Sequence, residues 1–176
     1  AVRNAATRAQ GGMRSAGVAW LLDLYGYKIY TLTGGYKAFR RWVLNRFEEP
    51  YEFKILGGYT GSGKTMLLRE MGKKDHPVID LEKMANHKGS AFGALGEDTQ
   101  PSQEMFENKL ALELSVKPFS WMEDESQRIG KMIIPNPIWK LMRNSPVSFI
   151  DIPFEARLDY ITREYGKFDK DNLSDA

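Results

Sequence analysis

The stretch Ile55–Thr65 reads ILGGYTGSGKT and decides the fold of this chain. From Gly58 to Thr65 it fits the pattern G-x-x-x-x-G-K-[ST] at every fixed position, with a short apolar run before it and a helix-like run after it. A glycine-rich turn with an incidental Lys-Thr pair would also match, but here the strand, loop and helix come in the required order. The sequence therefore predicts a P-loop, which binds a di- or triphosphate.

The residue types in this loop suit phosphate chemistry. Glycines let backbone N–H groups close around a phosphate, and the N-terminus of the following helix adds partial positive charge. Lys64 reaches the outer phosphates and is a candidate catalytic group, while the hydroxyl of Thr65 is a candidate ligand for Mg²⁺. The predicted phosphate-binding residues are Gly58, Gly61, Ser62, Gly63, Lys64 and Thr65.

Composition restricts the function classes. The chain has 176 residues, 42% of them apolar and 27% charged, as in an ordinary globular protein with a real core. The net charge of +2 is too small to argue for nucleic acid by itself. Because there is no cysteine, disulfides, thiolate metal sites and cysteine nucleophiles are excluded within this chain. No apolar run approaches the roughly 18 residues that span a bilayer, so we expect a cytoplasmic protein without a membrane partner.

Three later segments are predicted to be strands that end in acidic residues. They are residues 77–82, 119–125 and 147–151. Together with the strand before the P-loop and the intervening helices, they predict an α/β, P-loop NTPase-like domain of three layers with a largely parallel sheet. Any of the three segments could supply the acid opposite the P-loop, because parallel strands end at one edge of a sheet. Asp80 is a candidate Mg²⁺ ligand together with Thr65, and it is also a candidate N-cap for a helix from Leu81, two roles that are compatible.

The segment from Asn86 to Gly96 is polar and glycine-rich and is too irregular for a helix or a strand. Such loops cover ligands more often than they build cores. Its polar candidates are His87 and Ser90, and His87 is either a catalytic base or a histidine without a catalytic role. The next residues, Gln100–Leu114, are predicted to form a helix that Ser102 caps.

The first fifty residues are organised differently. A helix is expected over Ala16–Tyr25 and a strand over Tyr27–Leu32, whereas residues 1–10 show no buried-strand pattern. An amphipathic helix that carries three arginines is predicted over Tyr36–Glu49. It is either a basic surface for RNA phosphates or a connector between domains. We favour the connector, because arginines on one helix usually form a solvated face.

The first 35 residues resemble the last part of a rhodanese domain. The resemblance rests on G-x-R-S at residues 12–15, a helix that ends in LYGY, and a strand that closes with LTGGY. In rhodaneses the active loop holds a persulfide-bearing cysteine, whose place here falls on Arg8 or Ala9, while Arg14 and Ser15 keep their loop positions. A sulfur-carrier step would then need a separate rhodanese-bearing chain. The expected division is a rhodanese-like remnant at 1–35, a connecting helix at 36–50, a P-loop domain at 51–166 and a solvated tail at 167–176.

Four blocks resemble the P-loop domain of the tRNA 2-selenouridine synthase family. They are GGYTGSGKT, VIDLEKMANHKGSAFGALG, QPSQEMFENKLALEL and WMEDESQRIGKMIIP. The order also agrees, since this family joins an N-terminal rhodanese domain to a C-terminal P-loop domain and continues further at both ends. The resemblance implies a transferase that acts on the wobble uridine of tRNA. It would replace the sulfur of 2-thiouridine with selenium from selenophosphate, through an S-geranylated intermediate made from geranyl diphosphate.

The resemblance also implies roles for individual side chains. The candidate catalytic residues are Lys64, Asp80, His87 and Glu123, and the candidate pocket residues are Glu82, Ser90, Glu125, Ser126 and Arg128. The P-loop would bind the diphosphate of geranyl diphosphate, and Lys64 with Mg²⁺ would stabilise the departing pyrophosphate. Two other functions fit the same residues. One is a small-molecule kinase, which would need an arginine-rich lid, and the other is a phosphate-binding module without catalytic activity.

Overall fold

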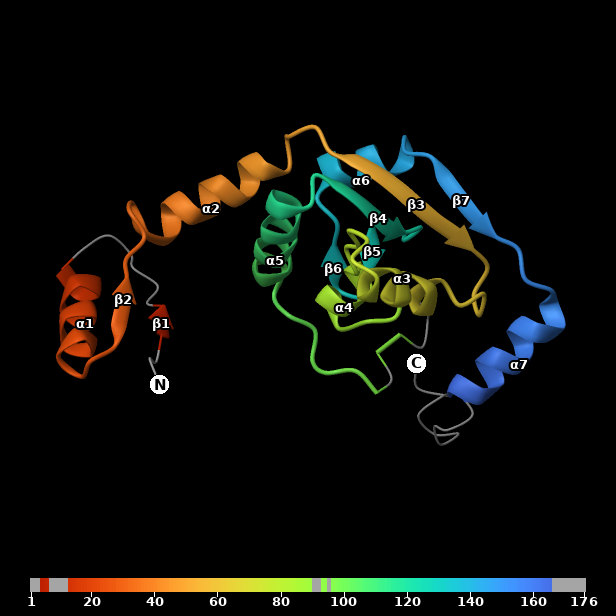
Figure 1. Cartoon of the computed structure of the whole chain (residues 1–176), viewed down its shortest axis with the longest axis horizontal. Coiled ribbons are helices and arrows are strands. Elements are labelled where there is room, and N and C mark those ends of the chain that lie inside the picture. The colour runs from red at the N-terminus through yellow and green to blue at the C-terminus, as the bar shows by residue number, and fades with distance from the viewer. Residues whose placement is uncertain (1–3, 7–12, 90–92, 95, 166–176) are drawn as a thin grey trace. The chain divides into compact units, whose positions relative to one another are not determined.

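The computed structural model describes residues 4–6, 13–89, 93–94 and 96–165, and the chain forms two compact units (Figure 1). The units are Ala1–Arg46 and Phe47–Ala176. The expected connecting segment at 36–50 is therefore divided, because its helix belongs to the first unit and its last residues belong to the second. The expected tail at 167–176 lies outside the described residues.

The first unit contains a parallel pair of short strands joined by a helix. Strand β1 (Asn4–Ala6) pairs with β2 (Lys28–Tyr30), α1 (Met13–Leu24) lies between them in the chain, and α2 (Gly35–Arg46) follows. The sequence predicts both helices and β2, but not β1. A three-residue strand has too few side chains to show a pattern and exists only through its pairing with a distant segment.

The start of α1 corrects one expectation about the rhodanese-like loop. Arg14 and Ser15 lie within the helix, which begins at Met13 and not at Ala16. Methionine and arginine both favour helical backbone, so the helix begins directly after the glycine pair. The two positions proposed for the missing cysteine, Arg8 and Ala9, lie outside the described residues.

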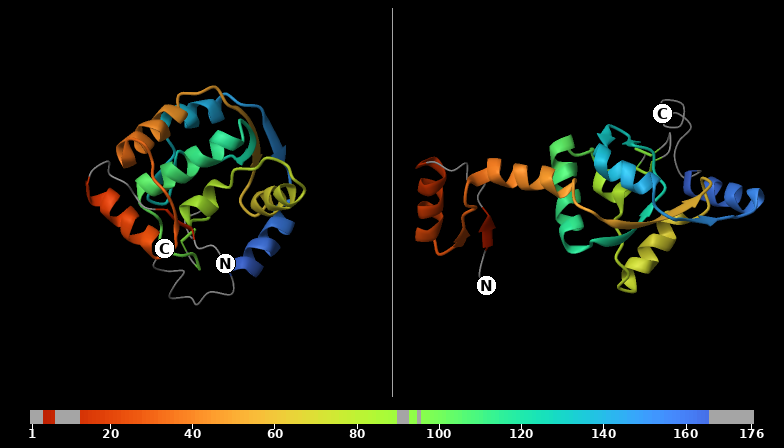
Figure 2. Two further views of the ribbon diagram at one scale, coloured as in Figure 1. Left: turned by 60° about the vertical axis from the view of Figure 1, so that its left-hand side comes forward. Right: turned by 90° about the horizontal axis from the view of Figure 1, so that it is seen from above.

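The second unit is built on a parallel three-stranded sheet. Its central strand is β3 (Glu52–Gly58), with β4 (Phe119–Glu123) on one side and β7 (Val147–Ile150) on the other. Helix α3 (Lys64–Lys73) packs on β3 and β4, and α6 (Asn136–Arg143) packs on β3 from the opposite face (Figure 2). The predicted α/β domain of helix, parallel sheet and helix is therefore confirmed.

The segment at 77–82 is not the strand that the sequence predicts. It contributes a single parallel bridge between Val78 and Trp121, and α4 (Leu81–Ala85) then begins. Asp80 is the N-cap of this helix, and its Oδ1 accepts a hydrogen bond of 2.8 Å from the backbone N–H of Lys83. The predicted cap is therefore confirmed, and it ends the extended backbone before a full strand forms.

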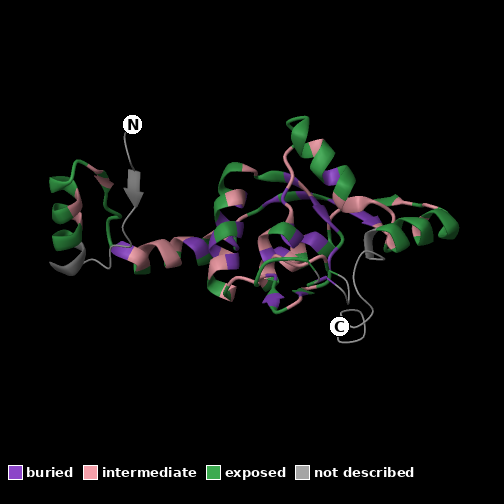
Figure 3. Ribbon diagram, turned by 90° about the horizontal axis from the view of Figure 1, so that it is seen from below, coloured by how far each residue is buried: buried purple, intermediate pink, exposed green. Residues whose placement is uncertain are grey.

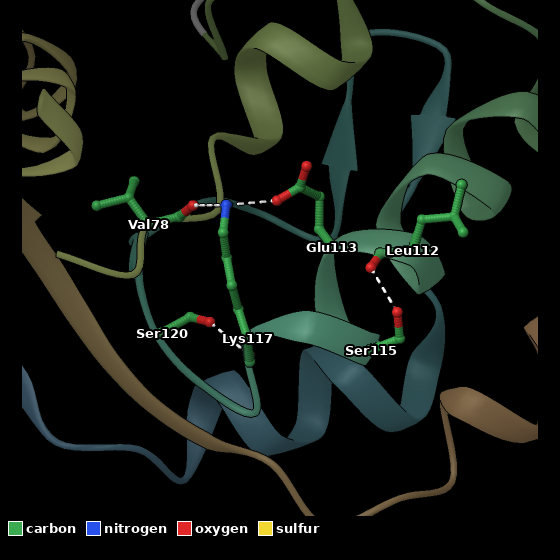
Figure 4. A network of polar contacts seen from close by, with 6 residues as sticks. All are labelled: Val78, Leu112, Glu113, Ser115, Lys117 and Ser120. Carbon is green, nitrogen blue, oxygen red and sulfur yellow. Dashed lines mark hydrogen bonds and ion pairs between the residues drawn. The ribbon is translucent and has the colours of Figure 1, made fainter. Parts of the chain in front are cut away.

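A lysine holds this shortened segment in place. Lys117 Nζ donates to the carbonyl oxygen of Val78 at 3.0 Å and also to the carboxylate of Glu113 (Figure 4). Lys117 is the C-cap residue of α5 (Gln103–Val116), so this contact ties the end of that helix to the chain that leads into α4. The start of α4 is thereby fixed beside the sheet.

The remaining elements that the structure describes in the second unit are two helices and a short hairpin. Ser102 caps α5 as expected, accepting a hydrogen bond from the N–H of Met105, although the helix begins three residues later than Gln100. A hairpin of β5 (Arg128–Ile129) and β6 (Met132–Ile133) follows β4, and the last described helix is α7 (Phe154–Tyr165). The sequence analysis predicts neither the hairpin nor α7.

Buried residues, purple in Figure 3, lie on the strands and on the helices of the second unit. Ile55 of β3 is fully buried and is paired in register with Met122 of β4, which is also fully buried. Leu68 of α3, Phe106 of α5 and Ile138 of α6 are each at most 2% exposed. None of the helices in the described part of the chain is long and apolar enough to cross a lipid bilayer.

Candidate functional site

The P-loop lies at the point where the central strand ends. Strand β3 ends at Gly58 and α3 begins at Lys64, so the five residues 59–63 form the connection. Gly63 precedes the helix with φ of 79°, a left-handed conformation that glycine adopts without strain. Among the described residues no side chain caps α3, and its first turn has no acidic residue. The first backbone N–H groups of the helix therefore suit an anion.

Lys64 reaches back across this loop. Its Nζ donates to the carbonyl oxygen of Gly58 at 2.9 Å and to that of Tyr59 at 3.4 Å. The ammonium group therefore lies close to Gly58 and Tyr59 at the start of the loop, although Lys64 itself is the first residue of α3. A phosphate bound in the loop would exchange these neutral acceptors for charged oxygens, which form stronger hydrogen bonds.

Three buried carboxylates lie opposite the loop. Glu82 of α4, Glu123 of β4 and Glu125 just after β4 are each at most 9% exposed. Each can offer one oxygen such that the three oxygens lie within 4.8 Å of one another. The hydroxyl of Thr65 donates to Glu82 Oε2 at 3.1 Å, which connects the P-loop to this group.

Burial shifts the pKa of every member of this glutamate group. The pKa of Glu82 rises to about 8 through loss of water and then through the charges of Glu123 and Glu125, against the hydrogen bond from Thr65. The pKa of Glu125 rises to about 7 through burial and the charge of Glu123. The pKa of Glu123 is also raised by burial, although Thr65 and Lys64 oppose that rise. Glu82 and Glu125 therefore exchange protons near neutral pH.

These carboxylates fit a hard divalent cation such as Mg²⁺. Such a cation takes oxygen ligands, and three close carboxylates beside a hydroxyl provide them. A bound cation would also replace the protons that burial otherwise favours. The residues suited to hold Mg²⁺ are therefore Glu82, Glu123, Glu125 and Thr65. When bound there, Mg²⁺ would supply positive charge for the phosphate oxygens.

Asp80 has a different position from the one expected of a metal ligand. Its Oδ1 caps α4, and its Oδ2 accepts from Arg69 Nε at 3.3 Å. Asp80 does not belong to the glutamate group and is not among the residues that line the cavity described below. Its catalytic and metal-binding roles stay predictions. The sequence analysis assigns Glu82, two residues further along, to the pocket, and the structure places it in the glutamate group that lines the cavity.

His87 contacts the site through a neighbouring glycine. The backbone N–H of His87 donates to the carbonyl oxygen of Glu82 at 3.1 Å, and its Nδ1 accepts from the N–H of Gly89 at 3.2 Å. Burial lowers the pKa of His87, which favours the neutral ring that can accept this bond. A methyl group on Gly89 would lie 2.6 Å from Glu125 Oε2, so the glycine backbone packs directly on that carboxylate.

Through these hydrogen bonds His87 contacts Glu82 and Gly89, which both line the cavity. It is not among the described residues that line the cavity, whereas Lys88 and Gly89 are. Its part in positioning Gly89 against Glu125 follows from the contacts, and its role as a catalytic base stays a prediction. Ser90, the other polar candidate in this loop, lies outside the described residues.

A cavity of about 580 Å³ joins the P-loop to the carboxylates. Its lining includes five of the predicted phosphate-binding residues, namely Gly58, Gly61, Gly63, Lys64 and Thr65. The sixth, Ser62, has a buried hydroxyl that lies 2.6 Å from the position of a methyl group on Gly58. The cavity is also lined by Glu82, Glu123, Glu125 and Ser126. Arg128 is exposed on β5 and is not among the lining residues.

The sequence analysis misses several basic residues of this cavity. Arg69 and Lys73 lie on α3, and Lys88 lies in the loop after α4. Each is paired with an acid, in the contacts Arg69–Asp80, Lys73–Glu70 and Lys88–Glu97. A signal for the first two was present, because Thr65, Arg69 and Lys73 are four residues apart and so share one face of the helix.

A parallel sheet with a P-loop at the end of its central strand, facing buried carboxylates across a cavity, defines an α/β domain of the P-loop class. The match with known families is more specific. Residues 51–175 match the family described as the tRNA 2-selenouridine synthase AAA domain, and the chain belongs to that family. The family resemblance seen in the sequence is therefore confirmed.

Curated relatives agree with this assignment. Proteins named tRNA 2-selenouridine synthase from Nitrosomonas europaea, Serratia proteamaculans and Bdellovibrio bacteriovorus are 38%, 40% and 41% identical over 166, 163 and 169 residues. The alignments cover 89% of this chain but only 42% to 43% of the relatives. The chain thus spans less than half the length of these relatives. No solved structure matches it significantly.

Proposed function

We propose that this chain is the phosphate-binding part of a transferase that converts the wobble 2-thiouridine of tRNA to 2-selenouridine. The observation that carries the proposal is the family match over residues 51–175, since these residues form both the P-loop and the glutamate group opposite it. The curated relatives carry the name tRNA 2-selenouridine synthase. The substrates in the proposal are tRNA, selenophosphate and geranyl diphosphate.

In this proposal the P-loop binds the diphosphate of geranyl diphosphate. The thiouridine sulfur forms a bond to the first carbon of the geranyl group while the carbon–oxygen bond to the diphosphate breaks. Negative charge then grows on the departing pyrophosphate, where Lys64 and the N–H groups of α3 can stabilise it. The selenium of selenophosphate then forms a bond to C2 of the base while the bond from C2 to the alkylated sulfur breaks and geranylthiol leaves. Alkylation makes this sulfur a better leaving group than the original thiocarbonyl sulfur. Water afterwards cleaves the selenium–phosphorus bond and releases phosphate.

The glutamate group has two parts in this mechanism. With Thr65 it is suited to hold Mg²⁺, which would add positive charge beside the diphosphate. When no cation is bound, Glu125, whose pKa burial raises to about 7, also suits proton transfer at neutral pH, because an acid–base group works best when its pKa is close to the working pH. The burial of the three glutamates and the closeness of their oxygens support these tasks for them over Asp80 and His87.

Binding measurements test the proposal. The chain and its Lys64→Ala variant are titrated with geranyl diphosphate and with ATP, with and without Mg²⁺, and Lys109→Ala on the exposed face of α5 is the control. Loss of charge-assisted hydrogen bonds should weaken geranyl diphosphate binding about tenfold to a hundredfold in Lys64→Ala and leave the control unchanged. Preference for ATP with turnover would instead favour a small-molecule kinase.

A product assay separates catalysis from binding alone. Thiolated tRNA is incubated with the chain and geranyl diphosphate, and the modified nucleosides are identified by mass spectrometry. Formation of S-geranyl-2-thiouridine that depends on Lys64 supports the transferase. Tight diphosphate binding without any modified nucleoside would instead assign this piece of the protein to phosphate binding without catalysis.

A further inference from the structure

Helix α7 packs against the P-loop, although the two are far apart in the sequence. A methyl group on Gly61 would lie 2.8 Å from Ile161 Cγ1 and 2.9 Å from the carbonyl oxygen of Arg157. Gly61 also has φ of 80°, so both its conformation and this close approach favour glycine. The backbone of the loop therefore lies directly against the side of the helix.

Arg157 fixes this contact. Its Nη1 donates to the carbonyl oxygen of Thr60 at 3.2 Å, and its Nε donates to the carbonyl oxygen of Ile152 at 3.1 Å. The guanidinium group also lies 4.8 Å from the ring centroid of Tyr59. One side chain therefore links α7, the residues before it and the P-loop. These contacts hold the helix at a defined place beside the P-loop.

The cavity has an apolar side at this contact. Ile161 and Tyr160 of α7 line it, and so does Met66 of α3, whose Cε lies 3.7 Å from the position of a methyl group on Gly63. Met66 is 59% exposed and Tyr160 is 40% exposed. Met66 lies on the face of α3 that also carries Arg69 and Lys73, at spacings of three and seven residues. Apolar surface is thus available next to the loop, close to the charged side chains.

We propose that Met66, Tyr160 and Ile161 form the subsite for the organic group of the phosphate ester that the P-loop binds. This inference rests on the proposed function in one respect, namely that the P-loop binds a diphosphate. The subsite would take an apolar or aromatic group, which gains free energy by covering these side chains. An isoprenoid chain and a nucleobase both have this chemistry. The three side chains therefore determine which diphosphate ester binds, whereas the P-loop binds the diphosphate common to all.

Calorimetric titration with three ligands tests the subsite. Inorganic pyrophosphate carries no organic group, geranyl diphosphate carries an isoprenoid chain, and ADP carries a base. The proteins are the unmodified chain, the double variant Met66→Ala/Ile161→Ala and the control Leu158→Ala, which removes an exposed side chain of α7 that does not line the cavity. The double variant should bind geranyl diphosphate about tenfold more weakly and pyrophosphate unchanged. The control should bind all three ligands normally.

Each result has a defined meaning. A loss for ADP in place of geranyl diphosphate also supports the subsite and identifies a nucleobase as its occupant. Equal losses for pyrophosphate and the esters would overturn the inference, because the loop itself would have changed, and so would no loss for any ligand. Failure of the unmodified chain to bind pyrophosphate would refute the proposed function and this inference together.

A second variant covers the case in which the double variant does not fold. Met66→Gln places a polar side chain of similar size at a position that is 59% exposed, so folding should be unaffected. The subsite requires that this variant bind geranyl diphosphate several-fold more weakly and pyrophosphate with unchanged affinity. Unchanged binding of both esters would exclude Met66 from contact with the organic group and overturn the assignment.

Discussion

Replacing Glu82 with glutamine tests how the buried carboxylates affect stability. Burial, followed by the charges of Glu123 and Glu125, raises the pKa of Glu82 from 4.5 to about 8. Between these pH values the folded protein keeps a proton that the unfolded chain has released, so the free energy of unfolding falls as the pH rises. The slope for one group is about 1.4 kcal/mol per pH unit, so raising the pH from 5 to 7 costs roughly 2–3 kcal/mol.

The Glu82→Gln variant should lose the part of the slope that Glu82 contributes, while Glu123 and Glu125, whose pKa values are also raised, keep theirs. Glutamine keeps a carbonyl oxygen that can accept the hydrogen bond from Thr65, but it has no proton to release in this range. We therefore expect the variant to resemble the unmodified protein at pH 5 and to be more stable at pH 8, by roughly 2–4 kcal/mol. Above the folded-state pKa the difference should become constant, because both states of the unmodified protein are then ionised at this residue.

Urea denaturation at pH 5, 7 and 8 measures the effect. The fluorescence of Trp121 and Trp139 reports on the second unit, and Glu155→Gln, an exposed change in the first turn of α7, is the control. The control should keep the slope of the unmodified protein. If Glu82→Gln also keeps that slope, Glu82 does not hold a proton in the folded state and the argument from its burial is wrong.

Magnesium gives an independent reading of the same group. A carboxylate must lose its proton to bind a cation, so Mg²⁺ should stabilise the unmodified protein more at pH 8 than at pH 5. Glu82→Gln should weaken this stabilisation, since it removes one charged oxygen from the group of three. An equal effect of Mg²⁺ on the protein and on the variant would argue against metal binding by Glu82.

Two further substitutions test the supports of the site. Gly89→Ala should destabilise the protein by about 1–2 kcal/mol in urea denaturation. Alanine is strained at φ of 63°, and its methyl group would meet the Glu125 carboxylate. Unchanged stability together with an unchanged response to Mg²⁺ would contradict this prediction. Lys117→Met should lower the free energy of unfolding by about 1–2 kcal/mol, because it leaves the Val78 carbonyl oxygen without this donor. The control Lys73→Met breaks an exposed ion pair and should change the free energy of unfolding by less than about 0.5 kcal/mol. Equal effects of the two substitutions would refute the argument.

Local rules predict much of this chain correctly. The P-loop pattern predicts the order of strand, loop and helix, because its glycines allow the tight turn between strand and helix and its lysine and threonine suit a phosphate and its cation. The cap at Ser102 and the alternative cap role of Asp80 also follow from contacts within three residues. The strand at 77–82 is wrong for a related reason. The apolar run at 77–79 is followed at once by the N-cap Asp80, so too few extended residues remain to form the backbone hydrogen bonds of a full strand.

Other features depend on contacts between distant residues. Strand β1 exists through its pairing with β2, and the β5–β6 hairpin is held by Gln103, whose side chain both donates to and accepts from the backbone of Ile133. Such bonds leave no periodic signal in the sequence. The apolar lining of the cavity also depends on contacts between distant residues, because Met66 and Ile161 come together at the P-loop only after α7 has packed there.

The sequence by itself determined that this protein has a P-loop, an α/β fold and membership of the tRNA 2-selenouridine synthase family. Tertiary structure decided which acids face the P-loop. Glu82 and Glu123 come from different elements, and only the packing of α4 beside the sheet brings their carboxylates together and removes them from water. Burial then raises the pKa of both residues, and the charges of Glu123 and Glu125 raise that of Glu82 further, an effect of proximity in space that sequence spacing cannot express.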